Sequence, residues 1–216
     1  MRVLVACEYS QTVTKAFRAK GHEAFSCDLL PTEGNPEWHI QGDAIEAAYS
    51  QPWDLMIAHP ECTYLTNAGV CWLYNKDGSR NEERWENMRS GARFFKALLD
   101  APISHKCIEN PIMHKYAAEI IGSRATQFVQ PWMFGHMEQK ATGLHLVNLP
   151  KLLPTDNVKE EMMKLPKNKR ERLHYLPPGP DRWKERSRTY QGIADAMADQ
   201  WGNLTNNKSA TAQEEE

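Results

Sequence analysis

The sequence predicts an α/β protein with a mainly parallel central sheet that carries helices on both faces. Short apolar runs suited to buried strands alternate with stretches whose apolar residues recur at helical spacing. This alternation is typical of parallel sheets, because two parallel strands need a long crossover that is usually a helix. With 216 residues the chain is long enough for one well-buried core, so residues 1–202 are expected to form a single domain.

The expected elements follow one another in a regular order. Strands are expected at Arg2–Ala6, Ala24–Cys27, His39–Ile40, Asp54–Ala58, Lys106–Glu109, Gln127–Val129 and Leu144–Val147. Helices are expected at Gln11–Lys20, Ala44–Ser50, Glu82–Leu99, Tyr116–Ile121 and Ile193–Trp201. The helix that begins at Glu82 has the clearest pattern, because its apolar residues return to one face at Trp85, Met88, Ala92, Phe95 and Leu99.

Residues 148–188 depart from this pattern. They contain six of the thirteen prolines and little periodicity, which predicts a mostly irregular insertion. Within it, residues 151–188 hold eleven Lys and Arg against six Asp and Glu, in a chain whose net charge is −2. This basic segment is the best candidate for contacting DNA phosphates, and a solvated surface segment is the equal alternative. The polar tail Asn203–Glu216 is expected to be disordered.

The composition is that of an ordinary globular protein, with 41% hydrophobic and 25% charged residues. No apolar run approaches the ~18–20 residues that span a bilayer, and the N-terminus is too soon polar for a secretory signal. The five cysteines are odd in number and scattered, which fits a reducing compartment and leaves thiols available for chemistry. A cytoplasmic protein is therefore expected.

Several polar side chains fall where the strands are expected to end, at Glu8, Asp28, Asp43, Cys62 and Glu109. Ligands of parallel α/β sheets bind just beyond the carboxyl ends of the strands, so these positions form the candidate site. Two of them lie within short motifs, His59-Pro60-Glu61-Cys62 and Ile108-Glu109-Asn110-Pro111.

The order and separation of these two motifs resemble the DNA cytosine-5 methyltransferases, and more closely a group of short phage-encoded proteins usually given that name. The resemblance implies a Rossmann-like methyltransferase fold and S-adenosylmethionine as cofactor. It also implies a nucleophile at Cys62 and a carboxylic acid at Glu109 that holds the target base. The further residues that it implies at the substrate are His59, Asn110 and Pro111, with Lys140 in place of an arginine that supports the nucleophile.

The chemistry explains why the family needs a thiol and an acid together. Carbon 5 of cytosine is a poor nucleophile until a thiolate adds to carbon 6, and addition is favoured when an acid hydrogen-bonds to ring nitrogen 3. Cys62 then needs help to ionise, for example from a helix N-terminus or from His59. Glu109 needs the opposite, because it must stay partly protonated, which requires burial.

The cofactor positions follow from the same resemblance. Glu8, Tyr9 and Ser10 lie in the first turn, where the family has a glycine-rich loop, and Pro60 is expected beside the cofactor. Asp28 matches an acid that binds ribose hydroxyls and Asp43 one that contacts adenine, although both could equally cap helices. This sequence departs from the family in having no glycine between Met1 and Lys20.

Other interpretations remain open. The insertion is too short for a target-recognition domain, so a DNA substrate would be recognised loosely, and a free cytosine nucleotide is an alternative substrate. A non-catalytic phage protein that binds a nucleotide or DNA in a degenerate pocket is the second hypothesis. Zinc binding is disfavoured and no metal is expected, because the spacings match no common module at His59, Cys62, His105, Cys107 and His114. The four cysteines other than Cys62 are assigned to packing, and Trp132 and Trp183 could stack on bases.

Overall fold

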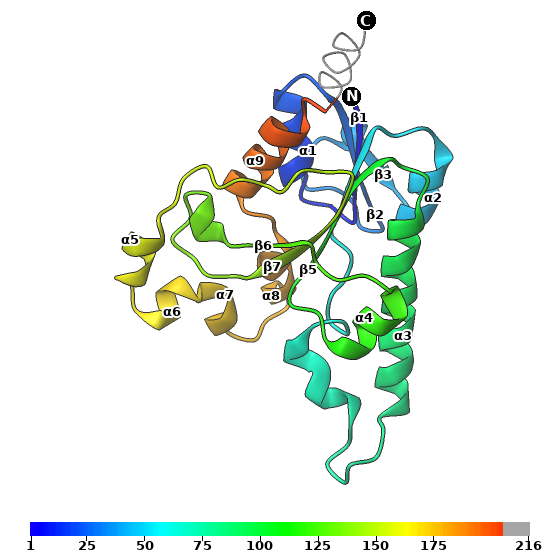
Figure 1. The fold of residues 1–216 in the computed structure, drawn as a ribbon, viewed down its shortest axis with the longest axis vertical. Coiled ribbons are helices and arrows are strands. Elements are labelled where there is room, and N and C mark those ends of the chain that lie inside the picture. The colour runs from blue at the N-terminus through cyan, green and yellow to red at the C-terminus, as the bar shows by residue number, and fades with distance from the viewer. Residues whose placement is uncertain (205–216) are drawn as a thin grey trace, which may run out of the picture.

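The computed structural model describes residues 1–204 and contains a seven-stranded sheet of order β3-β2-β1-β4-β5-β7-β6 (Figure 1). The strands are β1 (Arg2–Ala6), β2 (Glu23–Asp28), β3 (His39–Gln41), β4 (Leu55–Ala58), β5 (His105–Asn110), β6 (Gln127–Val129) and β7 (Thr142–Val147). Strands β1 to β5 pair in parallel, whereas β7 runs antiparallel to both β5 and β6. The prediction of an α/β fold with a mainly parallel central sheet is confirmed.

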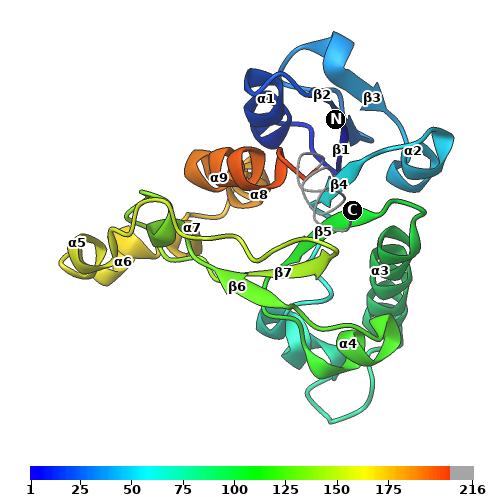
Figure 2. The same ribbon diagram turned by 45° about the horizontal axis from the view of Figure 1, so that its top comes forward.

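Two hydrophobic cores lie on opposite faces of the sheet. Along β1, Leu4 and Ala6 belong to the first core, whereas Val3 and Val5 belong to the second. This separation follows from the alternation of side chains along a strand. Helices α2 (Ala44–Ser50), α3 (Glu82–Asp100) and α4 (Lys115–Ile121) cover the first face, and α1 (Thr12–Ala19) and α9 (Gln191–Trp201) cover the second (Figure 2).

Capping residues mark the ends of helices α3 and α4. The Asn81 side chain caps α3 by accepting a hydrogen bond from Arg84 N at 3.1 Å, and Gly122 ends α4 in the left-handed conformation with φ 72°. At the other end of α3 the buried Lys106 ammonium donates to the carbonyl of Ala101 at 2.7 Å. These contacts satisfy backbone groups that helix termini leave unpaired.

The insertion at 148–188 is more regular than predicted, because it contains the short helices α5 (Lys159–Met163), α6 (Lys167–Arg170), α7 (Arg172–Tyr175) and α8 (Arg182–Ser187). Each has at most six residues, which is too short for a helical period to emerge from the sequence. Buried Met162 and Leu173 anchor this segment. The structure also contains the 3₁₀ helices η1 (Pro36–Trp38), η2 (Asn67–Leu73) and η3 (Pro131–Met133), which the sequence pattern did not predict.

Helices α5 to α7 lie beyond the β6 edge of the sheet, on the side away from α2 and α3 (Figure 2). Of the tail predicted at Asn203–Glu216, residues 205–216 lie outside the described residues. Within residues 1–204, no helix is both long enough and apolar enough to cross a membrane.

Trp201 is expected to anchor the second core. Its side chain is fully buried and its indole N–H donates to Pro150 O at 3.0 Å, which fastens the start of the insertion to α9. We expect Trp201→Ala to lower the free energy of unfolding by about 3–5 kcal/mol, as measured by urea denaturation. The control Trp72→Ala changes a side chain that is 64% exposed and should stay within about 0.5 kcal/mol of the parent. Equal losses in the two variants would contradict this assignment.

Candidate functional site

Backbone hydrogen bonds hold the loop after β4 against the segment that follows β5. Leu65 N donates to Cys62 O at 3.0 Å, which closes a turn directly after the cysteine. His114 N then donates to Leu65 O at 3.0 Å, and the His114 ring donates to Tyr64 O at 2.9 Å. Because His114 also caps α4, the loop that carries Cys62 is fixed relative to the strand that carries Glu109.

His59 and Glu109 form a buried pair between the ends of β4 and β5. His59 N donates to Ala6 O at 3.0 Å, which continues the pairing of β1 with β4. The His59 Nδ1 lies 2.9 Å from Glu109 Oε2, and the two side chains are only 10% and 17% exposed. Cys107, two residues before Glu109 on β5, lies in the second core, so Glu109 projects toward the face covered by α1 and α9.

The charges of this pair correct one prediction. Burial by itself would raise the pKa of Glu109, but the hydrogen bond and charge of His59 and the charge of Lys140 hold it below its ordinary 4.5. Burial would likewise lower the pKa of His59, yet Glu109, helped by Glu8, raises it above 6.5. Glu109 was predicted to stay partly protonated. Its lowered pKa instead favours an ionised carboxylate, which accepts a hydrogen bond from the His59 ring.

The thiol of Cys62 is neutral in this arrangement. Burial raises its pKa, and Glu109 adds to the rise, while Lys140 and Arg186 partly offset it. The cations that lower the pKa of Cys62 are thus Lys140 and Arg186 rather than the His59 suggested by the sequence, and they do not outweigh burial. Because these groups influence one another, Cys62, Glu109, Lys140 and Arg186 occupy one neighbourhood.

Helix α8 supplies the positive charge that the sequence analysis did not single out. The Lys140 Nζ donates to the carbonyl of Arg186 at 2.9 Å, which joins the segment before β7 to α8. Arg188, just after α8, forms an ion pair with Glu33. The only sequence signal for this arrangement was the basic composition of residues 151–188, which does not say which arginine reaches the cysteine.

Tyr9 lies beneath α8 and is largely buried. Its ring packs against Trp183 with centroids 5.7 Å apart, and its hydroxyl lies 3.4 Å from Ser187 Oγ. Trp183 was a candidate for stacking on bases, and it stacks on Tyr9 instead, although 48% of its surface stays exposed. Tyr9, predicted at the cofactor, is thus covered by the insertion.

The first turn reaches a left-handed conformation without glycine. Cys7 and Gln11 each have φ 58°, which costs non-glycine residues of order 1–3 kcal/mol. The buried Gln11 amide offsets this cost, because its Nε2 donates to Ser26 Oγ at 3.1 Å and to Asn35 O at 2.8 Å, and its Oε1 accepts from Asn35 N at 2.7 Å. Gly34 is required beside it, because a Cβ there would lie 2.1 Å from Gln11 Oε1.

Glu8, predicted at the cofactor, bonds to the first turn of α1. Its Oε1 accepts a hydrogen bond from Val13 N at 2.7 Å, and its Oε2 accepts from Thr14 N and from the Thr14 hydroxyl at 3.2 and 2.7 Å. The carboxylate therefore caps the N-terminus of α1, where negative charge is favourable. This engagement favours a structural role for Glu8 over the predicted contact with cofactor.

Asp28 ends β2, and Asp43 lies between β3 and α2. Burial raises the pKa of the Cys7 thiol, and both carboxylates raise it further, so all three groups lie close together. One oxygen of Asp28 accepts from Leu30 N at 2.9 Å, and Asp43 caps α2 through Ile45 N at 2.7 Å. Each carboxylate uses its Oδ1 for these bonds, so capping and ligand binding are compatible.

The remaining predicted positions differ in exposure. Pro60 is buried, whereas Ser10 is half-buried with its hydroxyl 3.2 Å from that of Thr12. Asn110 is buried and its amide donates to Pro111 O, while its Oδ1 has no partner among the described residues. As the residue after Glu109 on β5, Asn110 projects toward the opposite face of the sheet, which separates its side chain from the His59–Glu109 pair.

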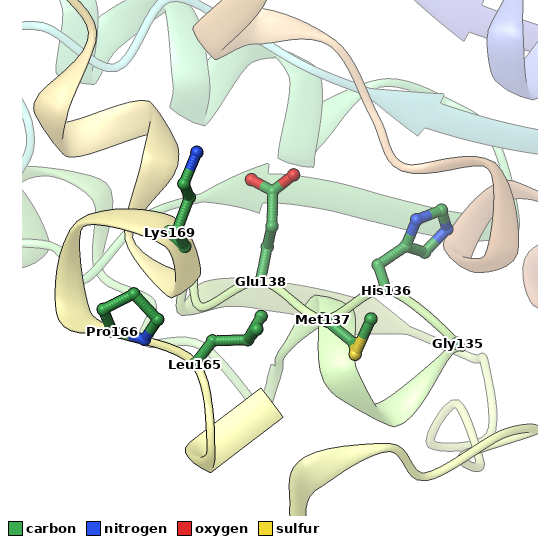
Figure 3. A pocket seen from close by; sticks show the side chains of 7 residues that line it. All are labelled: Gly135, His136, Met137, Glu138, Leu165, Pro166 and Lys169. Carbon is green, nitrogen blue, oxygen red and sulfur yellow. The ribbon is translucent and has the colours of Figure 1, made fainter. Parts of the chain in front are cut away.

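Two hollows lie near β7. A small one is lined by Glu109, Lys140, Arg188, Tyr190 and neighbouring apolar residues. A wide depression of about 620 Å³ lies outside it, between the segment Gly135–Glu138 and α6 (Figure 3). Glu138, which lines the wide depression, accepts a hydrogen bond at 2.8 Å from Tyr190, which lines the small hollow, and its other oxygen accepts from Arg172 at 3.0 Å.

The other cysteines and the suggested metal ligands are dispersed. Cys27 and Cys107 are buried, as expected for packing, but Cys71 is exposed, which corrects its assignment to the core. Cys71 lies on η2, whose unpredicted turn carries it to the surface. Nowhere in the described part of the chain do three histidine, cysteine or acidic side chains gather as a metal site would require.

The chain is similar to known proteins only in its structure. No family model matches the chain, and no curated protein matches it. Among solved structures, a similar one is provisionally described as a DNA modification methyltransferase encoded within a prophage of E. coli. It is 13% identical with a TM-score of 0.43, and the match covers 77% of this chain and 56% of that chain. This chain thus spans just over half the length of that protein.

The His59–Glu109 pair predicts a pH-dependent stability. The raised pKa of His59 contributes stability that is present below its ordinary 6.5 and is lost as pH rises through the raised value. The lowered pKa of Glu109 contributes stability that is present above 4.5 and is lost as pH falls. Glu109→Gln should therefore destabilise the protein more at about pH 5.5 than at about pH 9 in urea titrations. Glu37→Gln, on an exposed side chain, is the control, and an equal effect of Glu109→Gln at both pH values would refute the pair.

Proposed function

We propose that this protein is a cytosine-5 methyltransferase that uses Cys62 as its nucleophile. The observation that carries the proposal is the convergence of Cys62 with Glu109, His59 and Lys140 at the carboxyl ends of neighbouring parallel strands. A sulfur nucleophile and a proton-bearing group beside it are the two elements that activation of cytosine at carbon 5 requires.

Each residue has a definable part in this reaction. Cys62 forms the bond to carbon 6 of the base, and Lys140 and Arg186 stabilise its thiolate because both cations lower the pKa of the thiol. Arg186 is held in place through its own carbonyl, which accepts from Lys140. Since burial keeps Cys62 neutral in the free protein, ionisation has to accompany substrate binding.

S-adenosylmethionine is the methyl donor that the proposal requires, since it supplies a methyl group on a sulfonium. The paired carboxylates of Asp28 and Asp43 fit its ribose hydroxyls and adenine, because each has one oxygen that its helix or turn does not use. The turn before α1 fits less closely, since the Gln11 side chain occupies space that a glycine would leave open. Asp28 and Asp43, with Ser10 and the buried Pro60, are the proposed cofactor contacts, and Glu8 acts behind them as a cap.

The proposed substrate is cytosine in DNA. The positive charge of segment 151–188 supports contacts with DNA phosphates. Three of its exposed lysines, Lys164, Lys167 and Lys169, lie in α6 or just before it. The nearby Arg172 is instead engaged by Glu138 and Glu185, so it serves the structure of the insertion. Recognition by such a surface would be weakly dependent on sequence.

Cys62→Ser is the principal test. Serine keeps the shape of the side chain but is a far weaker nucleophile, so 5-methylcytosine in the DNA of cells that express the protein should fall to background, as measured by mass spectrometry. Cys71→Ser, at an exposed cysteine, should leave the modification unchanged. Wild-type protein that gives no more 5-methylcytosine than Cys62→Ser, and that binds no S-adenosylhomocysteine by calorimetry, would refute the proposal and leave a binding protein.

DNA binding has a separate test. Changing Lys164, Lys167 and Lys169 together to Glu should weaken binding of a fluorescent oligonucleotide, and the slope of log affinity against log salt should flatten by about 0.9 for each duplex phosphate contact that is lost. Changing the exposed lysines Lys15, Lys76 and Lys115 together to Glu is the control with the same change in charge. Affinity that does not depend on salt would exclude DNA as the partner of this segment.

A further inference from the structure

His59 carries a buried nitrogen that no group in the described structure satisfies. Its Nδ1 is used by Glu109, whose ionised carboxylate can only accept, so Nδ1 is the donor in that bond. Its Nε2 is shielded from solvent and has no partner among residues 1–204. Leaving a polar atom unpaired in such a place is unfavourable, and a ligand that accepts a hydrogen bond from it would remove that cost.

The charged groups around His59 come from three elements. Glu109 on β5 bonds it directly, Glu8 from the turn after β1 adds a second negative charge, and Lys140 from the segment before β7 opposes them. Cys62 follows three residues later on the same loop. The two carboxylates therefore favour an imidazolium whose Nε2–H has no acceptor within residues 1–204.

We infer that His59 is the catalytic residue that delivers the proton to the target base through Nε2, and that Glu109 is the positioning residue that holds the imidazolium. This inference rests on the proposed function. It assigns to Glu109 an indirect part, because its carboxylate already has a partner and cannot approach the base as an acid.

The proton transfers balance in both directions. The Cys62 thiolate, whose proton has gone to solvent, forms a bond to carbon 6. The electron pair of the C5=C6 double bond forms a double bond between carbons 4 and 5, and the pair of the C4=N3 double bond moves to nitrogen 3. Nitrogen 3 takes the proton from His59 Nε2, and the neutral imidazole keeps its Nδ1–H bond to Glu109. On reversal nitrogen 3 returns that proton to His59, and the bond between sulfur and carbon 6 breaks.

Hydrogen exchange at carbon 5 tests this step without a methyl donor. While the adduct exists, carbon 5 takes deuterium from heavy water and then releases its own hydrogen to solvent, so reversal leaves a labelled cytosine. The probes are a single-stranded oligonucleotide that contains cytosine, and dCMP, each followed by mass spectrometry with full-length protein. Wild-type exchange should depend on Cys62 and should follow a bell-shaped pH profile, because it needs ionised Cys62 and protonated His59.

The variants give opposite results for the two possible acids. His59→Gln should slow exchange by about 10²-fold or more and convert the bell into a single rise with pH, because only the thiol then titrates. Glu109→Gln should keep the bell but move both of its limbs to lower pH, because Glu109 raises the pKa of His59 and that of Cys62. His59→Asn serves as a second variant, and thermal melting confirms that each variant is folded.

The outcomes separate failure of the inference from failure of the proposed function. If Cys62-dependent exchange occurs and folded His59→Gln or His59→Asn keeps the bell while Glu109→Gln abolishes it, Glu109 is the acid and the inference is overturned. If wild-type protein exchanges neither probe, and Cys62→Ser behaves identically, the proposed function itself fails.

Discussion

The ion pair between His59 and Glu109 is the interaction on which the site depends. It joins the ends of β4 and β5 at 2.9 Å, and it is held where both side chains are almost closed to solvent. Removing two charges from water costs several kcal/mol per ion, and their attraction often does no more than offset that cost. An apolar pair would serve stability as well, so the persistence of two charges at the strand ends is better explained by chemistry than by folding.

The turn after β1 illustrates how a chain can meet a backbone requirement in an unfamiliar way. The turn needs left-handed residues, and glycine is the residue that adopts them at least cost. Here Cys7 and Gln11 adopt them instead, and the Gln11 amide ties the turn to the segment that precedes η1. The contact still includes a glycine, but on its other side, because Gly34 leaves the space that the Gln11 side chain fills.

The sequence predicted the sheet and its covering helices well, because parallel strands that are buried on both faces have short continuous apolar runs, whereas the helices have apolar residues at a period of 3.6. The helix from Glu82 and the strand at Arg2–Ala6 are found where the pattern placed them. The positions of Cys62 and Glu109 at one edge of the sheet could be predicted from the sequence, because each follows or ends one of two parallel strands. The pairing of Glu109 with His59 could not be predicted, because no sequence pattern distinguishes an acid that contacts a base from one that bonds to a histidine.

The insertion was the least predictable part for a related reason. Its helices have four to six residues and owe their places to tertiary contacts such as those between Trp183 and Tyr9. Local propensity does not determine such short helices, because most helical stability in proteins comes from packing. The consequence for the site is large, since α8 carries Arg186 to the neighbourhood of Cys62 from more than a hundred residues away.

The distribution of charge resolves two opposing demands within one small site. A protonated imidazole at His59 requires negative neighbours, whereas a thiolate at Cys62 requires positive ones. The structure places Glu109 and Glu8 around His59, and it brings Arg186 from α8 toward Cys62, with Lys140 acting on both. Glu109 raises the pKa of Cys62 as well as that of His59. Once His59 has given up its proton, it no longer offsets the negative charge of Glu109, and that charge opposes the thiolate of Cys62 more strongly. Arg186 acts beside Lys140 as a second cation that lowers the pKa of Cys62, so a site with Lys140 alone would favour the neutral thiol even more strongly.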